Sequence, residues 1–138
     1  GVHFFDMLSW VFGDLKKNIV HTKTHDRAAG YLELEKARVR WFLSINGNIL
    51  PENIKKIGQT TYRSITIGGK EIEFSDGFKD LHTIIYKDII KQKRGFGLKA
   101  SRQAIEIVHN IRHATPLGAK GEYHPFVKKP LSKHPFEK

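Results

Sequence analysis

The stretch Gly30-Tyr31-Leu32-Glu33-Leu34-Glu35, followed by Arg38-Val39-Arg40-Trp41-Phe42-Leu43-Ser44-Ile45, decides the fold of this chain. Side chains alternate in both segments: Leu32 and Leu34 oppose Glu33, and Trp41 opposes Arg40. A period of two residues is typical of β-strands with one buried face. The short link between the segments predicts a hairpin, and therefore antiparallel pairing.

The segment before this hairpin predicts a buried helix and a further strand. Val2, Phe5, Leu8 and Phe12 recur at helical spacing over residues 1–12, and Gly13 is placed to end the helix. Residues 18–25 alternate more loosely, as an additional strand would.

The segment after the hairpin predicts a loop over residues 46–59, with one helical turn after Pro51. A second hairpin follows. Its strands are residues 60–67 and 70–74, and Gly68-Gly69 forms the turn between them.

Two helices are expected in the last third of the chain. Ser75-Asp76 would cap the first, over residues 78–92, whose apolar face holds Phe78, Leu81, Ile85 and Ile89. The second spans residues 99–113 and would bury Ala104, Val108 and Ile111, with Ile105 beside them.

This order of elements predicts an α+β fold, an open and predominantly antiparallel β-sheet with helices packed on one face. We expect one domain over residues 1–118. Residues 119–138 form a basic tail containing Pro125, Pro130 and Pro135, for which an extended arm or disorder is expected.

The composition is that of a globular, strongly basic protein. Apolar residues make up 39% of the chain, and 24 Lys and Arg against 14 Asp and Glu give a formal charge of +10. That charge favours partners that carry phosphate, such as nucleic acid, an anionic membrane or a nucleotide-linked small molecule. No apolar run approaches the roughly 18 residues of a membrane span. The absence of cysteine fits a cytoplasmic location.

Two groups of residues could carry chemistry. His3 and Asp6 lie three apart on the first helix, where His3 is either a general acid/base or a histidine buried inside an apolar helix. Arg40, Tyr62 and Arg63 suit a sheet face that grips phosphate and stacks a base, or one that arginines merely keep soluble. Alternation places Arg40 and Trp41 on opposite faces, so the basic and aromatic residues cannot all line one pocket.

Neither a metal site nor a complete nicotinamide site is expected. His109 and His113 lie four apart, but no carboxylate accompanies them in a metal-binding arrangement. The glycines of Arg94-Gly95-Phe96-Gly97 follow no strand and lack the spacing of a dinucleotide fingerprint, which favours an interhelical turn.

The opening Gly-Val-His-Phe-Phe-Asp, residues 1–6, resembles the Gly-x-His-x-x-Asp helix motif of the Gfo/Idh/MocA oxidoreductases. Four further strings are similar to one branch of that family, the UDP-N-acetylglucosaminuronic acid 3-dehydrogenases of lipopolysaccharide O-antigen biosynthesis. They are residues 29–35, residues 38–45, Thr61-Tyr62-Arg63-Ser64-Ile65-Thr66 and Gly77-Phe78-Lys79-Asp80-Leu81-His82-Thr83. The resemblance extends from Gly1 to about Phe126.

The resemblance implies that this chain is the C-terminal, substrate-binding and oligomerisation half of a two-domain enzyme. The N-terminal Rossmann domain, which is absent here, would bind NAD and supply the catalytic lysine of a Glu-Lys-Pro motif. This segment alone would then be inactive and would bind no cofactor. Homo-oligomers would form through the open face of the sheet, and neither a membrane nor a nucleic-acid partner is implied.

The implied reaction is hydride transfer from C3 of a UDP-N-acetylglucosaminuronic acid type sugar to NAD. His3 would hold or deprotonate the 3-hydroxyl. We expect the sugar nucleotide to contact Arg40, Tyr62, Arg63, His82 and Thr83. Two alternatives remain, a non-catalytic dimerisation module and a basic nucleic-acid-binding module.

Overall fold

The computed structural model describes residues 1–76, 80–95, 97–130 and 132–134, and it confirms the sheet predicted from the sequence. Strands β1 (Leu15–Lys23), β2 (Arg27–Leu34) and β3 (Arg38–Ser44) form an antiparallel sheet in the order β1-β2-β3. Gly30 pairs with Val20 on one side and with Trp41 on the other, and register shifts interrupt β1 at residues 15–17 and 20–22. The architecture is therefore α+β with open antiparallel sheets.

The chain divides into two compact units. The first comprises Gly1–Asn46 with Phe96–Ser132, and the second comprises Gly47–Gly95 with Lys133–Lys138. The first unit contains the three-stranded sheet, helices α1 (Val2–Phe12) and α4 (Leu98–His113), and the short helix η2 (Pro125–Val127).

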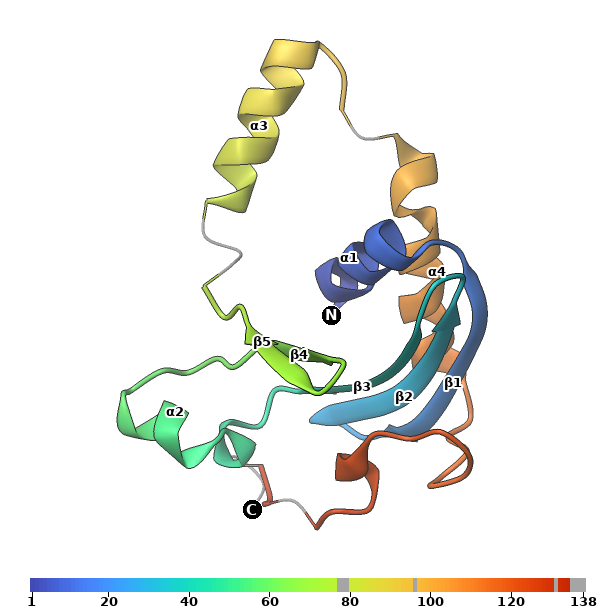
Figure 1. Ribbon diagram of the computed structural model, residues 1–138, viewed down its shortest axis with the longest axis vertical. Coiled ribbons are helices and arrows are strands. Elements are labelled where there is room, and N and C mark those ends of the chain that lie inside the picture. The colour runs from blue at the N-terminus through green and yellow to red at the C-terminus, as the bar shows by residue number, and fades with distance from the viewer. Residues whose placement is uncertain (77–79, 96, 131, 135–138) are drawn as a thin grey trace. The chain divides into compact units, whose positions relative to one another are not determined.

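Helices α1 and α4 pack together over one face of this sheet (Figure 1). Phe5 and Leu8 of α1 and Ile107 of α4 are at most 1% exposed, and the ring of Phe5 meets Trp41 edge-on at 5.3 Å. Burial of each such side chain stabilises the fold by about 1.5–3 kcal/mol. Gly13 ends α1 as predicted, because its positive φ of 86° is one that glycine adopts without strain.

The buried face of α4 differs from the prediction. Ala104 and Ile111 are buried as expected, but Ile107 takes the central place, whereas Val108 is only partly buried and Ile105 is 58% exposed. Apolar residues at 105, 107 and 108 allow two neighbouring faces at helical spacing. The packing against α1 and β1 selects one of them.

The opposite face of the sheet is covered by residues 115–130, which we call the strap (Figure 1). Leu117 N donates to Val20 O at 2.9 Å and Gly118 N donates to His21 O at 3.0 Å, so the strap pairs with the edge strand β1. The rings of Phe42 and Phe126 lie 5.0 Å apart. Of the two expectations for the tail, disorder does not hold for residues 119–130, because contacts between residues distant in the sequence hold them against the sheet.

The second unit contains η1 (Gly47–Ile49), α2 (Glu52–Lys56), the hairpin of β4 (Ser64–Ile67) with β5 (Lys70–Glu73), and α3 (Leu81–Gln92). The predicted Gly68-Gly69 turn is confirmed, with φ values of 57° and 81°. Such positive values suit the tight turn of a two-residue hairpin.

The helix α3 begins later than predicted, and its predicted cap is wrong. Ser75 instead belongs to the base of the β4–β5 hairpin, where its hydroxyl accepts a hydrogen bond from Arg63 N at 2.9 Å. Asp80 precedes the helix, and Phe78, the expected first residue, lies outside the described residues. No residue of α3 is fully buried, but Leu81, Ile85 and Ile89 of the predicted apolar face are half-buried, whereas Ile84 and Ile90 outside it are exposed.

Candidate functional site

The candidate catalytic residue His3 lies in the first turn of α1, on an exposed part of that helix. Two contacts hold this turn in place. Phe5 packs on Trp41 of the sheet, and Phe4 N donates a hydrogen bond to Gly1 O at 3.1 Å. Asp6, three residues on, is exposed as well. The alternative of a histidine sealed inside an apolar helix therefore does not hold, and His3 is accessible to a ligand.

Arg40 lies on the other face of the sheet. It neighbours Trp41, which faces α1, and it shares its side of β3 with Phe42, which contacts the strap. The structure therefore separates Arg40 from His3, as the alternation of β3 predicts. Arg40 lies instead near His124 of the strap, where burial, and then the charge of Arg40, lower the pKa of that imidazole.

Tyr62 and Arg63 lie together at the base of the β4–β5 hairpin. Tyr62 Oη donates to Glu71 Oε1 at 2.5 Å, which raises the pKa of Tyr62 because the carboxylate stabilises the protonated phenol. Arg63 Nη1 donates to Ser75 O at 2.8 Å. Both side chains thus take part in bonds that shape the hairpin.

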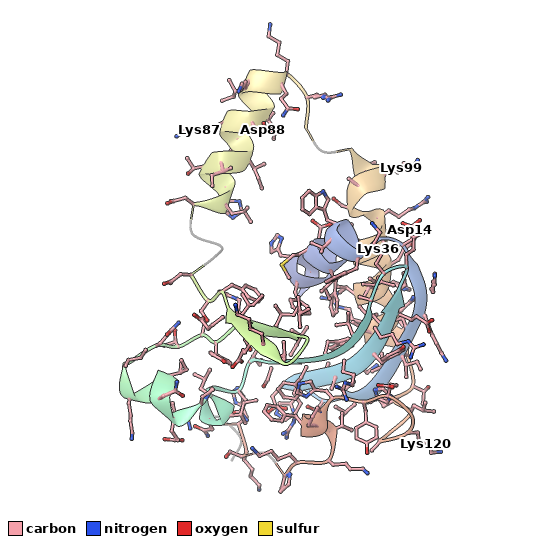
Figure 2. All side chains as sticks on the ribbon, viewed as in Figure 1. Asp14, Lys36, Lys87, Asp88, Lys99 and Lys120 are labelled. Atoms are coloured by element: carbon pink, nitrogen blue, oxygen red, sulfur yellow. The ribbon has the colours of Figure 1, made fainter. Side chains whose placement is uncertain are left out.

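His82 and Thr83 lie in the first turn of α3, and both are exposed. The charged residues Lys87 and Asp88 lie one turn further along α3 (Figure 2). Tyr62, Arg63, His82 and Thr83 all belong to the second unit, and His3 and Arg40 belong to the first.

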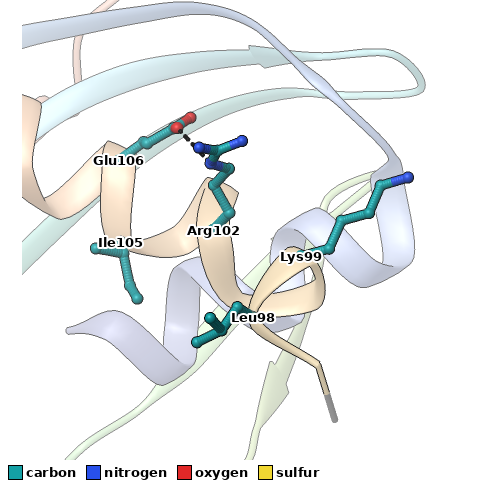
Figure 3. A pocket seen from close by; sticks show the side chains of 5 residues that line it. All are labelled: Leu98, Lys99, Arg102, Ile105 and Glu106. Atoms are coloured by element: carbon teal, nitrogen blue, oxygen red, sulfur yellow. Dashed lines mark ion pairs between the residues drawn. The ribbon is translucent and has the colours of Figure 1, made fainter.

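An open depression runs along the outer side of α4 (Figure 3). Leu98, Lys99, Arg102, Ile105 and Glu106 line it, and Arg102 Nε lies 3.4 Å from Glu106 Oε1. All five belong to a single helix. The depression offers an apolar strip between charged side chains and contains none of the candidate site residues.

Two polar features were not singled out from the sequence. Asp26 is buried in the turn between β1 and β2, where it accepts hydrogen bonds from Thr24 Oγ1 at 2.7 Å and Asn46 Nδ2 at 3.0 Å. His124 caps η2, with Nδ1 accepting from Phe126 N at 3.2 Å. Two sequence patterns could have indicated these features. One is the Thr-x-Asp turn between two strands, residues 24–26, and the other is the polar residue His124 directly before Pro125.

The described residues hold no group of three or more His, Asp or Glu side chains that could bind a metal ion. The rings of His109 and His113 stack at 4.2 Å, and His113 Nδ1 lies 2.8 Å from His109 O. That nitrogen is thus engaged by the helix backbone.

The described residues do not fit a dinucleotide cradle either. Every strand pairing among them is antiparallel, and Gly95 and Gly97 follow helix α3 where a nicotinamide fold has a strand. Nor does any helix in the described part of the chain have the length and apolarity needed to cross a bilayer.

Comparison with known proteins shows what this chain is similar to. No protein-family model matches it. The fold is similar to two crystal structures of the WlbA (WbpB) dehydrogenase from Thermus thermophilus, with 46% and 45% sequence identity and TM-scores of 0.83 and 0.82. Each match covers 91% of this chain. One structure is a complex with NAD and α-ketoglutarate, and the other a complex with NAD and UDP-GlcNAcA.

The chain spans about two fifths of the length of this dehydrogenase, 41% and 40% in the two structures. The resemblance predicted from the sequence is thus confirmed: the chain is similar in sequence and fold to one part of the WlbA (WbpB) dehydrogenase.

Proposed function

We propose that this chain is the substrate-binding part of an NAD-dependent dehydrogenase that oxidises C3 of a UDP-N-acetylglucosaminuronic acid type sugar in lipopolysaccharide biosynthesis. The observation that carries the proposal is the 46% identity over 91% of the chain to a dehydrogenase solved with NAD. Its second structure contains UDP-GlcNAcA.

His3 is the residue to which we assign proton transfer. Oxidation of a secondary alcohol breaks the C3–H bond and the O–H bond of the 3-hydroxyl, and it forms the C3 carbonyl. The His3 imidazole accepts the hydroxyl proton, and its position in an exposed first turn leaves it accessible to the substrate. NAD would accept the hydride from C3.

We place NAD on polypeptide outside this chain, because the described strands are antiparallel and form no dinucleotide cradle. The length of the relative supports this division, since this chain corresponds to only 41% of it. The segment by itself is then expected to turn over no substrate.

The sugar nucleotide carries two phosphates and a carboxylate, and the formal charge of +10 suits such a ligand. Tyr62, Arg63, His82 and Thr83 remain our candidates for its contacts. Arg40 is a weaker candidate for the same pocket as His3, because it lies on the strap side of the sheet.

A chimera tests the function directly. This chain replaces the matching part of the Thermus dehydrogenase, and the NADH formed on adding UDP-GlcNAcA is followed by absorbance. The proposal predicts substrate-dependent NADH formation and a 3-keto product, with UDP-glucose a poor substrate because it lacks the carboxylate. A folded chimera that binds NAD but leaves UDP-GlcNAcA unoxidised would favour the alternative, a purely structural module.

A further inference from the structure

The ring of His124 lies between the strap and the sheet. It stacks on Phe42 of β3, with centroids 5.6 Å apart and an interplanar angle of 25°, and it meets Phe126 edge-on at 5.0 Å. The imidazole is half-buried. It thus forms the centre of an aromatic contact that joins residues distant in the sequence.

One ring nitrogen of His124 has a fixed role. Nδ1 accepts the backbone N–H of Phe126 at 3.2 Å and so caps η2. A nitrogen that accepts a hydrogen bond carries no proton, so the cap requires a neutral imidazole with its proton on Nε2. Protonation of Nδ1 turns the acceptor into a donor that faces another donor.

The charged groups near His124 add to this effect. Arg40 faces it from β3, and two lysines of the strap lie over neighbouring rings, Lys128 at 5.0 Å from Tyr123 and Lys129 at 5.2 Å from Phe126. Glu122 lies on the side of Tyr31, and His21 of β1 contacts Tyr123. Arg40 is the charged group that acts on the imidazole itself, and a second positive charge beside it is unfavourable.

We propose that His124 makes the strap a pH-sensitive latch, which is closed on the sheet when the imidazole is neutral and released when it is protonated. This inference does not depend on the proposed function. Release uncovers the middle of the sheet, where Ala29, Tyr31 and His21 are at most 5% exposed.

The direction of the pH dependence follows from the closed state. Burial, followed by the charge of Arg40, lowers the pKa of His124 below its ordinary value of 6.5. The open strap, whose imidazole is solvated, binds the proton more tightly than the closed strap. Closure is therefore fully favoured above about pH 6.5 and is lost as the pH falls through the closed-state pKa.

Hydrogen exchange of the 138-residue chain tests the latch. The reporters are the amides of Leu117 and Gly118, which bond to β1, and the amides of β2 serve as the reference for global unfolding. Between pH 7.5 and 5, the protection factors of the two strap amides should fall, by roughly tenfold for each unit of pKa difference between closed and open states. The protection factors of the β2 amides should not change over the same pH range.

The variant His124→Asn separates charge from contact. An asparagine side chain caps a helix N-terminus well and does not titrate. The variant should keep the strap protected at both pH values, whereas His109→Asn, an exposed change on α4, should retain the wild-type pH response. Equal strap protection in the wild type at both pH values, or a pH response in His124→Asn that matches the wild type, would overturn the latch.

A second measurement serves if His124→Asn does not fold. Nitrogen-detected NMR of the wild-type imidazole should show the Nε2–H tautomer at pH 7.5, and its titration should coincide with the loss of strap protection. The Nδ1–H tautomer at pH 7.5, or a titration that leaves the strap closed, would overturn the proposal.

Discussion

The indole of Trp41 lies directly over the Cα of Gly30, so closely that a Cβ atom at position 30 would come within 2.5 Å of Trp41 Cζ2 and 2.2 Å of Ile19 O. The glycine allows this close approach of the indole, which forms a T-shaped pair with the ring of Phe5 of α1, at an interplanar angle of 84°. The position of α1, and hence of His3, therefore depends on a missing side chain in the middle of the sheet.

Gly30→Ala is expected to lower the free energy of unfolding by about 1–3 kcal/mol, because the added methyl group must displace either the indole or the β1 backbone. Urea unfolding measures the loss. Gly47→Ala is the matched control: a Cβ at that position meets nothing within 4 Å, and its effect should stay within about 0.5 kcal/mol. Equal stability of the two variants would contradict the close packing.

Lys23 caps the C-terminus of α4, where Nζ donates to Arg112 O at 2.7 Å and Ala114 O at 3.1 Å. Lys23→Met should cost about 1 kcal/mol, since two carbonyls lose a charged donor at the negative end of the helix dipole. Lys99→Met, at the other end of α4, should leave stability almost unchanged. Thermal unfolding of both variants decides the point, and equal losses would refute the cap.

The buried carboxylate of Asp26 predicts a stability that depends on pH. Three interactions contribute most to lowering the pKa of this carboxyl below its ordinary value of 3.8. In order of size, they are the hydrogen bond from Thr24, the hydrogen bond from Asn46 and the charge of Arg27. The stabilisation is therefore present above about pH 3.8 and is lost as the pH falls through the folded-state pKa.

Asp26→Asn would place an amide donor opposite Asn46 Nδ2, so the variant should be less stable than the wild type at pH 7. The difference should shrink as the pH approaches 3, because the wild-type carboxyl then protonates as well. Asp88→Asn on α3 should show a much smaller difference at every pH. A gap for Asp26→Asn that stays constant from pH 7 to 3 would rule out the carboxylate as its source.

The bond between Tyr62 and Glu71 can be measured on the phenol itself. Glu71→Gln removes the charge that favours the protonated phenol, so the pKa of Tyr62 should fall toward its ordinary value of 10. Tyr31 is the internal control, because burial is the main reason that its pKa is raised, and it should titrate unchanged. NMR titration of ring-labelled tyrosine resolves the two, and an unmoved Tyr62 would show that Glu71 is not its partner.

Much of the fold could be predicted because the decisive patterns are local. The alternation through Leu32, Leu34 and Trp41 sets one buried face of the three-stranded sheet. Gly68-Gly69 defines the separate β4–β5 hairpin without any distant contact. The buried face of α4 could not be chosen from the sequence, since Ile105 and Ile107 fit helical spacing on adjacent faces and tertiary packing decides between them.

The contacts of the strap could not be predicted from the local sequence. Three prolines in residues 119–138 indicate an extended segment, and nothing local reveals that His21 binds Lys120 O at 3.0 Å across 99 positions. Strand alternation predicts the separation of Arg40 from His3. The exposure of His3 could not be predicted, because the first helix is apolar nearly all round and tertiary packing decides that Phe5 and Leu8 form its buried side. No local pattern predicts that Tyr62, Arg63, His82 and Thr83, our candidates for sugar-nucleotide contacts, belong to the second unit.

The most direct test of the central claim is the turnover of the chimeric dehydrogenase with His3→Asn, compared with His109→Asn as the exposed control. If His3 accepts the proton of the 3-hydroxyl, kcat should fall roughly 10²- to 10⁴-fold with little change in the KM for UDP-GlcNAcA, and the control should retain full activity. Unchanged turnover in folded His3→Asn would contradict the assignment of this imidazole to the reaction.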